Sequence, residues 1–280
     1  RGLPANEGRP FMKHEALLLF CLLLLMIFPR AAQGQEDKNY GSWSLYWEND
    51  YLARTDSNYT NGGRLTWTSP WISWKPEADS DPPGTTPWYH SLIKALPFFY
   101  APGSQSGMFL TFGQNIYTPD DLYRQDVIVD DRPYAGYLYL GFGLIRKSAR
   151  YMDTLEVDVG IVGRHSYAED VQEQVHQWIG NNEPKGWANQ LQDEPALEIT
   201  YEHKWKWLNA EAANHWGYDL IPHAGFAVGN VAIYANAGAE FRVGWNRPND
   251  FGTCTIRPGC ESGAFPDDEN PYRSGGSRFG

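Results

Sequence analysis

The sequence is poor in cysteine, in positive charge and in long apolar segments. Only three of its 280 residues are cysteine, and 23 Lys and Arg stand against 34 Asp and Glu, which gives a formal net charge of −11. Such an acidic balance argues against a nucleic acid partner, because phosphate backbones are bound by basic patches. The only long apolar run covers residues 16–28, and no later stretch predicts a transmembrane helix.

That apolar run is typical of a secretory signal peptide. Met12 is the expected start, because nothing before it shows a structural pattern, and Lys13 provides a short basic region. The run over 16–28 is short for a transmembrane helix, and Ala32 and Gly34 supply small residues for cleavage. The sequence therefore predicts an exported protein in three parts: 1–11 as upstream translated residues, 12–34 as signal peptide and 35–280 as the mature chain.

Several motifs of soluble enzymes are also missing. The sequence has no GxSxG nucleophile elbow, no HExxH zinc pair and no phosphate-binding glycine loop. The mature chain keeps two cysteines, Cys254 and Cys260. In an oxidising compartment this spacing suits a small-loop disulfide, and it is equally compatible with two unpaired thiols.

What the chain does contain is a series of long segments in which apolar and polar residues alternate. In residues 153–163, Leu155, Val157, Val159 and Ile161 fall on one side of an extended strand, and mainly polar residues fall on the other. With this segment, the chain has about eight predicted strands. The other seven lie at 42–48, 64–69, 107–115, 134–145, 196–207, 218–228 and 231–245.

The length and polarity of these segments favour a membrane barrel. They approach the roughly 9–11 residues that a tilted strand needs to cross a bilayer. Charges occupy their polar sides, and the abundant aromatics, with Trp 12, Tyr 17 and Phe 13, gather near segment ends. We therefore expect an all-β, antiparallel transmembrane β-barrel that is apolar outside and polar inside. A soluble barrel with the same alternation is the alternative interpretation.

One segment, residues 166–180, breaks the alternation and predicts a helix in a long loop. Ser166 and Glu169 fit a capping box at its start, and Gly180 fits its C-terminal end. A helix in a loop between two barrel strands is a candidate for function, because long ordered loops often carry it. The expected apolar stripe consists of Val171, Val175 and Ile179.

Two places in the sequence have residue types suited to chemistry. On the predicted helix, His176 follows Gln172 by four residues, so the two share a surface, and an oriented imidazole suits a general base. The alternative is a solvated helix histidine. After the first strand, Asn49 and Asp50 offer oxygen ligands of the kind that calcium prefers, although a polar strand end is the alternative.

Five segments, taken in order, resemble the outer-membrane lipid A 3′-O-deacylase family. They are WENDYLARTDSNYTNGGRLTWTSP, FGQNIYTPDDL, DDRPYAGYLYLGFG, AEDVQEQVHQWIG and PKGWANQLQDEPALEITYE, within residues 43–245. The resemblance implies a closed barrel of twelve strands in the bacterial outer membrane, with the active site between the barrel wall and a loop helix. It further implies hydrolysis of the ester-linked 3′ acyloxyacyl chain of lipid A, with calcium as cofactor and lipopolysaccharide as substrate.

The resemblance also implies a role for individual residues. His176 would activate water, and Gln172, Asn49 and Thr60 would complete the catalytic set. Asp50, together with Asn49, would hold the calcium ion that stabilises the oxyanion. The family's basic residues that bind a lipid A phosphate correspond to Arg124. We therefore expect the side chains of Asp50, Thr60 and His176 to converge on one cleft at the barrel rim.

The sequence departs from the family in its number of strands. About eight are visible where the family has twelve, and the chain stops at Gly280 in a loop-like stretch, so we expect a C-terminally truncated barrel. Two other functions remain open at this point. One is a related outer-membrane phospholipid esterase, and the other is a non-enzymatic barrel or porin, which would not need a helix with paired Gln and His. Oligomeric state is not predicted.

Overall fold

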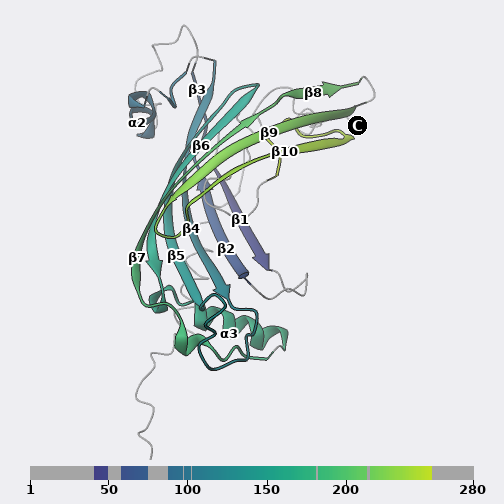
Figure 1. Cartoon of the computed structure of the whole chain (residues 1–280). Helices are drawn as coiled ribbons and strands as arrows, with labels where there is room; N and C mark the ends of the chain where they lie inside the picture. The colour runs from purple at the N-terminus through teal and green to yellow at the C-terminus, as the bar shows by residue number, and fades with distance from the viewer. Residues whose placement is uncertain are drawn as a thin grey trace, which may run out of the picture. The chain divides into compact units, whose positions relative to one another are not determined.

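The described part of the chain forms one antiparallel β-sheet (Figure 1). A computed structural model describes residues 41–49, 58–74, 88–96, 98–101, 103–180, 182–212 and 215–253. Its strands are β1 (Ser42–Asn49), β2 (Asn58–Thr68), β3 (Ile72–Ser73), β4 (Gln105–Thr118), β5 (Ala135–Lys147), β6 (Tyr151–Val162), β7 (Glu194–Trp205), β8 (Leu208–Glu211), β9 (Trp216–Gly229) and β10 (Tyr234–Trp245).

The long strands lie side by side in the order in which they occur in the sequence. The long strands follow one another as β1-β2-β4-β5-β6-β7-β9-β10, while the short β3 and β8 pair with β4 and β9. This confirms both the eight predicted strands and their antiparallel pairing in sequence order. In the described residues β1 and β10 lie at opposite ends of this order and the sheet is not closed, so each has one unpaired edge.

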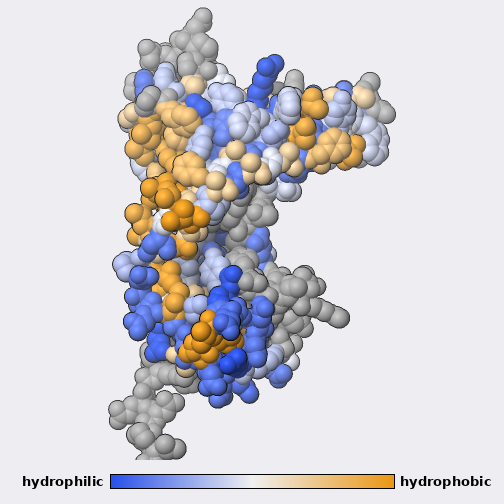
Figure 2. Space-filling model, viewed as in Figure 1, coloured by the Kyte–Doolittle hydropathy of each residue, from blue (hydrophilic) through white to orange (hydrophobic). Residues whose placement is uncertain are grey.

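One face of the sheet, called here the outer face, is apolar and exposed. A single row of paired residues crosses six strands on this face, and all its members are apolar: Leu45, Leu65, Phe112, Leu140, Val159 and Leu197. Leu140 is 65% exposed and Val159 is 61% exposed. In Figure 2, apolar residues line the side of the sheet where β7 lies in Figure 1. Such a surface suits lipid rather than water, which confirms the inside-out pattern.

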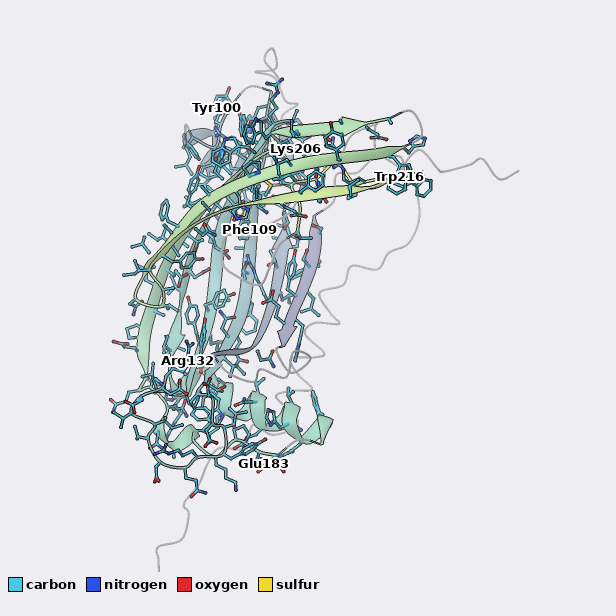
Figure 3. All side chains as sticks on the ribbon, turned by 45° about the vertical axis from the view of Figure 1, so that its right-hand side comes forward. Tyr100, Phe109, Arg132, Glu183, Lys206 and Trp216 are labelled. Carbon is cyan, nitrogen blue, oxygen red and sulfur yellow. The ribbon has the colours of Figure 1, made fainter. Side chains whose placement is uncertain are left out.

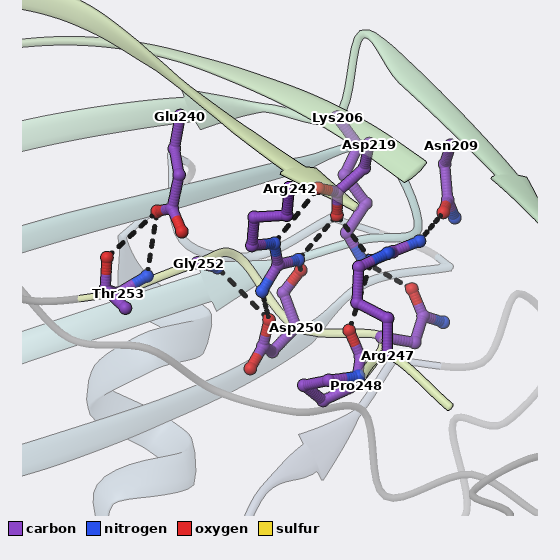
Figure 4. Close-up of polar contacts among 11 residues, drawn as sticks. Lys206, Asn209, Asp219, Glu240, Arg242, Arg247, Pro248, Asp250, Gly252 and Thr253 are labelled. Carbon is purple, nitrogen blue, oxygen red and sulfur yellow. Dashed lines mark hydrogen bonds and ion pairs between the residues drawn. The ribbon is translucent and has the colours of Figure 1, made fainter. Parts of the chain in front are cut away.

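The opposite, inner face is polar and buried. Arg64 on β2 forms a salt bridge of 3.1 Å with Glu156 on β6, and both side chains are almost completely buried. On β9 and β10, Asp219 accepts hydrogen bonds from Arg242 and Arg247, within the network drawn in Figure 4. Buried charges are tolerated when they are paired in this way.

The connections between strands alternate between two ends of the sheet. At one end, helix α3 (Ala168–Ile179) lies in the connection from β6 to β7, between the short turns η2 (Arg164–Ser166) and η3 (Trp187–Asn189). Helix α2 (Tyr89–Ala95), in the connection from β2 to β4, lies at the other end (Figure 1). No helix among the described residues is long and apolar enough to cross a membrane.

The predicted helix is present, but its start differs from the expected one. Tyr167 precedes α3 in a left-handed conformation with φ 57°, and no side chain caps the helix. Ser166 belongs to η2 and donates to the carbonyl oxygen of Gly163 at 2.5 Å, so the predicted capping box is wrong. Gly180 ends the helix at φ 70°, as predicted. The predicted leader at 1–34, Asp50, Cys254 and Cys260 lie outside the described residues.

Candidate active site

Helix α3 is packed tightly against the sheet where β4 and β5 end. Ile116 on β4 pairs with Gly136 on β5, and Ile116 shares a buried cluster with Ala168 of the helix. A Cβ atom at Gly136 would lie 2.0 Å from the Oγ of Ser166 and 2.3 Å from the Cβ of Ala168. Gln114 on β4 donates its amide to the Ser166 carbonyl oxygen at 2.6 Å. Because Gly136 has no side chain, the helix can pack closely against strands β4 and β5.

The wall positions that contact the helix segment belong to the outer face. Gln114 and Ile116 fall on the same side of β4 as Phe112, because side chains alternate along a strand. Gly136 likewise falls on the side of Leu140. The helix segment thus covers the end of the apolar surface, rather than the polar interior of the sheet.

Two of the three most buried residues of α3 are polar. Ala168, Gln172 and His176 follow one another at intervals of four, and their exposed fractions are 1%, 1% and 4%. Val171 and Val175 of the expected apolar stripe are only half-buried. The helix therefore buries the face that carries Gln172 and His176.

The amide of Gln172 is oriented by a tryptophan. The indole Nε1 of Trp187 donates to Oε1 of Gln172 at 2.8 Å. Because an indole N–H can only donate, the contact identifies Oε1 as the acceptor and places Nε2 on the other side. Nε2 is buried and has no hydrogen-bond partner among the described residues. Leaving a buried donor unpaired costs about 1–3 kcal/mol, so its retention points to a ligand.

The imidazole of His176 is also held in a defined state. Its Nδ1 lies 2.6 Å from the backbone carbonyl oxygen of Asn182. A carbonyl oxygen only accepts, so Nδ1 carries the proton and, in the neutral ring, Nε2 carries the lone pair. This is the arrangement that a histidine needs to take a proton from water.

The sheet register brings the backbone of Asn49 to the end of the sheet that carries α3. Asn49 pairs with Asn61 on β2, and Asn61 pairs with Ile116 on β4, which packs against Ala168 of the helix. Two strand spacings of about 4.8 Å separate Asn49 from Ile116, or roughly 10 Å of backbone. Thr60 sits at a β-bulge, where the register of β2 shifts.

The predicted convergence of the Asp50, Thr60 and His176 side chains is not tested. The side chains of Asn49 and Thr60 and the whole of Asp50 lie outside the described residues. Within the part of the chain that the structure describes, no group of three or more His, Cys, Asp or Glu residues could hold a metal ion. The calcium site and the convergence of Asp50, Thr60 and His176 therefore stay predictions.

Arg124 is exposed, in a connection that packs against the segment after α3. Its carbonyl oxygen would lie 3.1 Å from a Cβ atom at Gly186, and Lys185 donates its backbone N–H to Leu122 at 2.8 Å. Asn189 donates to the carbonyl oxygen of Gln125 at 2.7 Å. These contacts bring the connection that carries Arg124 to the exposed Lys185, a cation that sequence reasoning did not single out.

The residues that orient the site were also missed from the sequence. Trp187 lies in PKGWANQ, where a tryptophan is more simply explained by packing, and the Asn182 contact uses only a backbone atom. The sequence signal that could have indicated Trp187 is the presence of a tryptophan within a polar, glycine-containing loop. Nothing in the residue types near Asn182 could have indicated the carbonyl.

Comparison with known proteins identifies the family. Residues 17–279 match a family model described as outer membrane protein LpxR. The chain belongs to the LpxR family. Among solved structures, LpxR from Salmonella typhimurium matches with a TM-score of 0.53 and 15% identity over 75% of this chain. At that identity the likeness shows the fold alone.

The matched region covers 64% of the Salmonella LpxR chain, which is less than two thirds of its length. No curated protein matches this chain. Membership of the LpxR family makes it an outer-membrane protein and confirms the family resemblance seen in the sequence.

Proposed function

We propose that the protein hydrolyses the ester bond that joins the 3′ acyloxyacyl chain to lipid A. Family membership supports a deacylase, and the helix α3 supplies the observation that carries the proposal. Gln172 and His176 are both buried on one face of the helix, and each is oriented by a residue of the segment that follows it. A porin would not need two polar side chains held in this way.

His176 is the proposed general base. Its Nε2 takes a proton from a water molecule, whose oxygen attacks the ester carbonyl carbon. When the tetrahedral intermediate collapses, the same nitrogen returns the proton to the departing 3′ oxygen of the sugar, which leaves a hydroxyl group and a free fatty acid. The hydrogen bond from Nδ1 to the Asn182 carbonyl keeps the ring oriented throughout.

Gln172 is the proposed hydrogen-bond donor to the oxyanion. Its Nε2 has no partner among the described residues, and the contact with Trp187 prevents the amide from turning its oxygen toward the substrate. A fixed donor of this kind stabilises the transition state more than the ground state, because the carbonyl oxygen becomes negative only during attack.

The residues at the end of β1 have the chemistry of a calcium site. Asp50 and Asn49 offer hard oxygen ligands, and the register places the Asn49 backbone on the rim that carries the helix. Bound there, a calcium ion would supply Lewis-acid stabilisation of the carbonyl oxygen. Thr60, at the bulge of β2, would position water or the ion, and Arg124 would bind a phosphate of lipid A.

Mass spectrometry of lipid A tests the proposal. Cells that express the full-length protein should contain lipid A lighter by one acyloxyacyl group. His176→Ala should abolish this change while the barrel still shows heat-modifiable migration. The matched control is Gln177→Ala, which alters an exposed residue on the same helix, one position after His176. Unchanged lipid A, or fatty acids released from phospholipid instead, would overturn the assignment.

A further inference from the structure

Helix α2 covers part of the outer face at the end of the sheet opposite α3. Met108 on β4 and Leu144 on β5 pair with each other and share the outer face with the exposed Leu110. Both are nevertheless buried, because they form one apolar cluster with Tyr89 and Ile93 of the helix. The helix therefore lies on the side of the sheet that faces lipid, and not beneath its polar interior.

Specific hydrogen bonds hold this segment in place. The hydroxyl of Tyr89 donates to the carbonyl oxygen of Pro70 at 2.8 Å. Ser106 on β4 donates to the carbonyl oxygen of Phe99 at 2.6 Å and accepts from the indole of Trp74 at 3.0 Å. The position of α2 on the outer face is thus part of the folded structure.

One exposed flank of α2 is apolar as well, while Ser91 and Lys94 are exposed on the rest of the helix. Trp88, Leu92 and Leu96 follow one another at intervals of four and are 71%, 39% and 36% exposed. Phe98, just beyond the helix, is also exposed. A helix on a water-covered surface normally presents polar residues on its free side. An exposed apolar flank, continuous with a lipid-facing sheet, indicates a further lipid contact.

Charged residues near α2 indicate the level in the membrane at which this helix lies. Asp153 on β6 lies on the outer face, where Arg146 forms a salt bridge with it at 2.6 Å and the hydroxyl of Tyr201 donates to it at 2.7 Å. The Arg146 guanidinium also lies 4.6 Å from the ring centre of Phe98. Ion pairs on the lipid side of a barrel belong at the level of the lipid headgroups, where aromatic residues also gather.

We propose that α2 is an interfacial helix whose free side contacts phospholipid at the headgroup level of the leaflet opposite α3. The contact rests on membership of the outer-membrane family and is independent of the proposed deacylase activity. Phospholipid is favoured over a protein partner because the apolar side of α2 continues the outer face without a break. Lys94, on the same helix, would reach the headgroups.

Depth-dependent quenching of a fluorophore tests this contact. Leu92→Cys would be made in the full-length protein with Cys254 and Cys260 changed to Ser, labelled with bimane and placed in phosphatidylcholine nanodiscs. Lipid brominated at the first acyl carbons should reduce the emission roughly twofold, because interfacial helices bury their apolar side about 5–10 Å into this region. Leu96→Cys provides a second position if the first variant fails to fold.

Glu183→Cys is the control for exposure to water. Glu183 is exposed at the end that carries α3, and Figure 3 shows it there, at the opposite end from Tyr100. A label at Glu183 should respond to aqueous iodide and not to brominated lipid. If labels at Leu92 and Leu96 behave like the one at Glu183, the helix faces water or a protein, and the proposal is wrong.

Discussion

The indole N–H of Trp187 is bonded to the amide oxygen of Gln172 at 2.8 Å, and both side chains are buried. The bond joins helix α3 to η3, which lies fifteen residues from Gln172 in the same connection. Its direction is fixed by chemistry, since the indole has no acceptor nitrogen. Consequently the tryptophan decides which end of the amide faces the candidate site.

Trp187→Phe should remove this control while an aromatic ring still fills the space. A net loss of about 0.5–1.5 kcal/mol for one hydrogen bond corresponds to a fall in kcat of about 2- to 10-fold, with KM little changed. Deacylation kinetics on purified lipid A measure both constants. Trp178→Phe, which alters an exposed tryptophan of α3, is the control. A change confined to barrel stability would show that Trp187 serves packing alone.

Gln172→Glu should be far more damaging. The substitution keeps an acceptor for Trp187 but replaces the free N–H donor by a carboxylate oxygen, which repels a developing oxyanion. Loss of one such donor typically lowers kcat by about 10²–10³-fold. Gln177→Glu, at an exposed position of the same helix, should retain activity. Comparable activity in both variants would exclude Gln172 from the site.

Gly136→Ala should displace helix α3 from strands β4 and β5. The added methyl group would overlap Ser166 and Ala168, so η2 and α3 must shift outward. A displacement of about 1 Å at a catalytic group can lower the rate about 10²-fold. Gly244→Ala is the matched control, because no atom lies within 4 Å of a Cβ there. Lipid A turnover and heat-modifiable migration together separate displacement from misfolding.

The two ends of the connection that carries α3 are joined by a pair with a defined pH dependence. Asp193 accepts from the backbone N–H of His165 at 2.8 Å, and this bond, with the contact to the imidazole, lowers the pKa of the Asp193 carboxyl. Because the pKa in the folded protein is lowered, the stabilisation is complete above the ordinary value of about 3.9 and is lost as pH falls through the lowered pKa.

Carbon-13 NMR of labelled aspartate, with Asp193→Asn for assignment, gives the midpoint of that titration. We expect a value below the ordinary one, with a partial return in His165→Ala, where the backbone donor remains. A midpoint at or above about 3.9 would mean that the pair is not formed in solution.

Calcium removal should abolish turnover reversibly. A chelator should stop deacylation and added calcium should restore it, since Asp50 and Asn49 carry the oxygen ligands proposed for the ion. Asp50→Asn should raise the calcium concentration needed for half-maximal activity, because one carboxylate charge is lost at constant size. Asp56→Asn, in the same connection, is the control. Full activity in chelator would eliminate the metal from the mechanism.

The sheet was predictable because its signal is local. Alternation at Leu155, Val157 and Val159 depends only on neighbouring residues, and it gave the strands, their pairing and the exposed outer face. The paired Gln172 and His176 were equally accessible, because helical spacing alone places them together.

The packing of the helix was not predictable from such patterns. Its stripe of Val171 and Val175 is only half-buried, although Val171 packs against the cluster that contains Ile116, and the most buried positions are instead Ala168, Gln172 and His176. The capping box failed because Ser166 belongs to η2, so that Tyr167 and not Ser166 precedes the first residue of the helix. Contacts such as the one between His176 and the Asn182 carbonyl depend on the path of a loop, which residue types do not encode.

The packing of α3 on the outer face has a consequence for how reaction rates must be expressed. A lipid reaches this surface by diffusing sideways within its own leaflet, so it need not leave the bilayer or enter the sheet. For the proposed deacylation, the effective substrate concentration is then the mole fraction of lipid A in the leaflet. Dilution with inert lipid should slow the enzyme even when the total amount of substrate in the tube is constant.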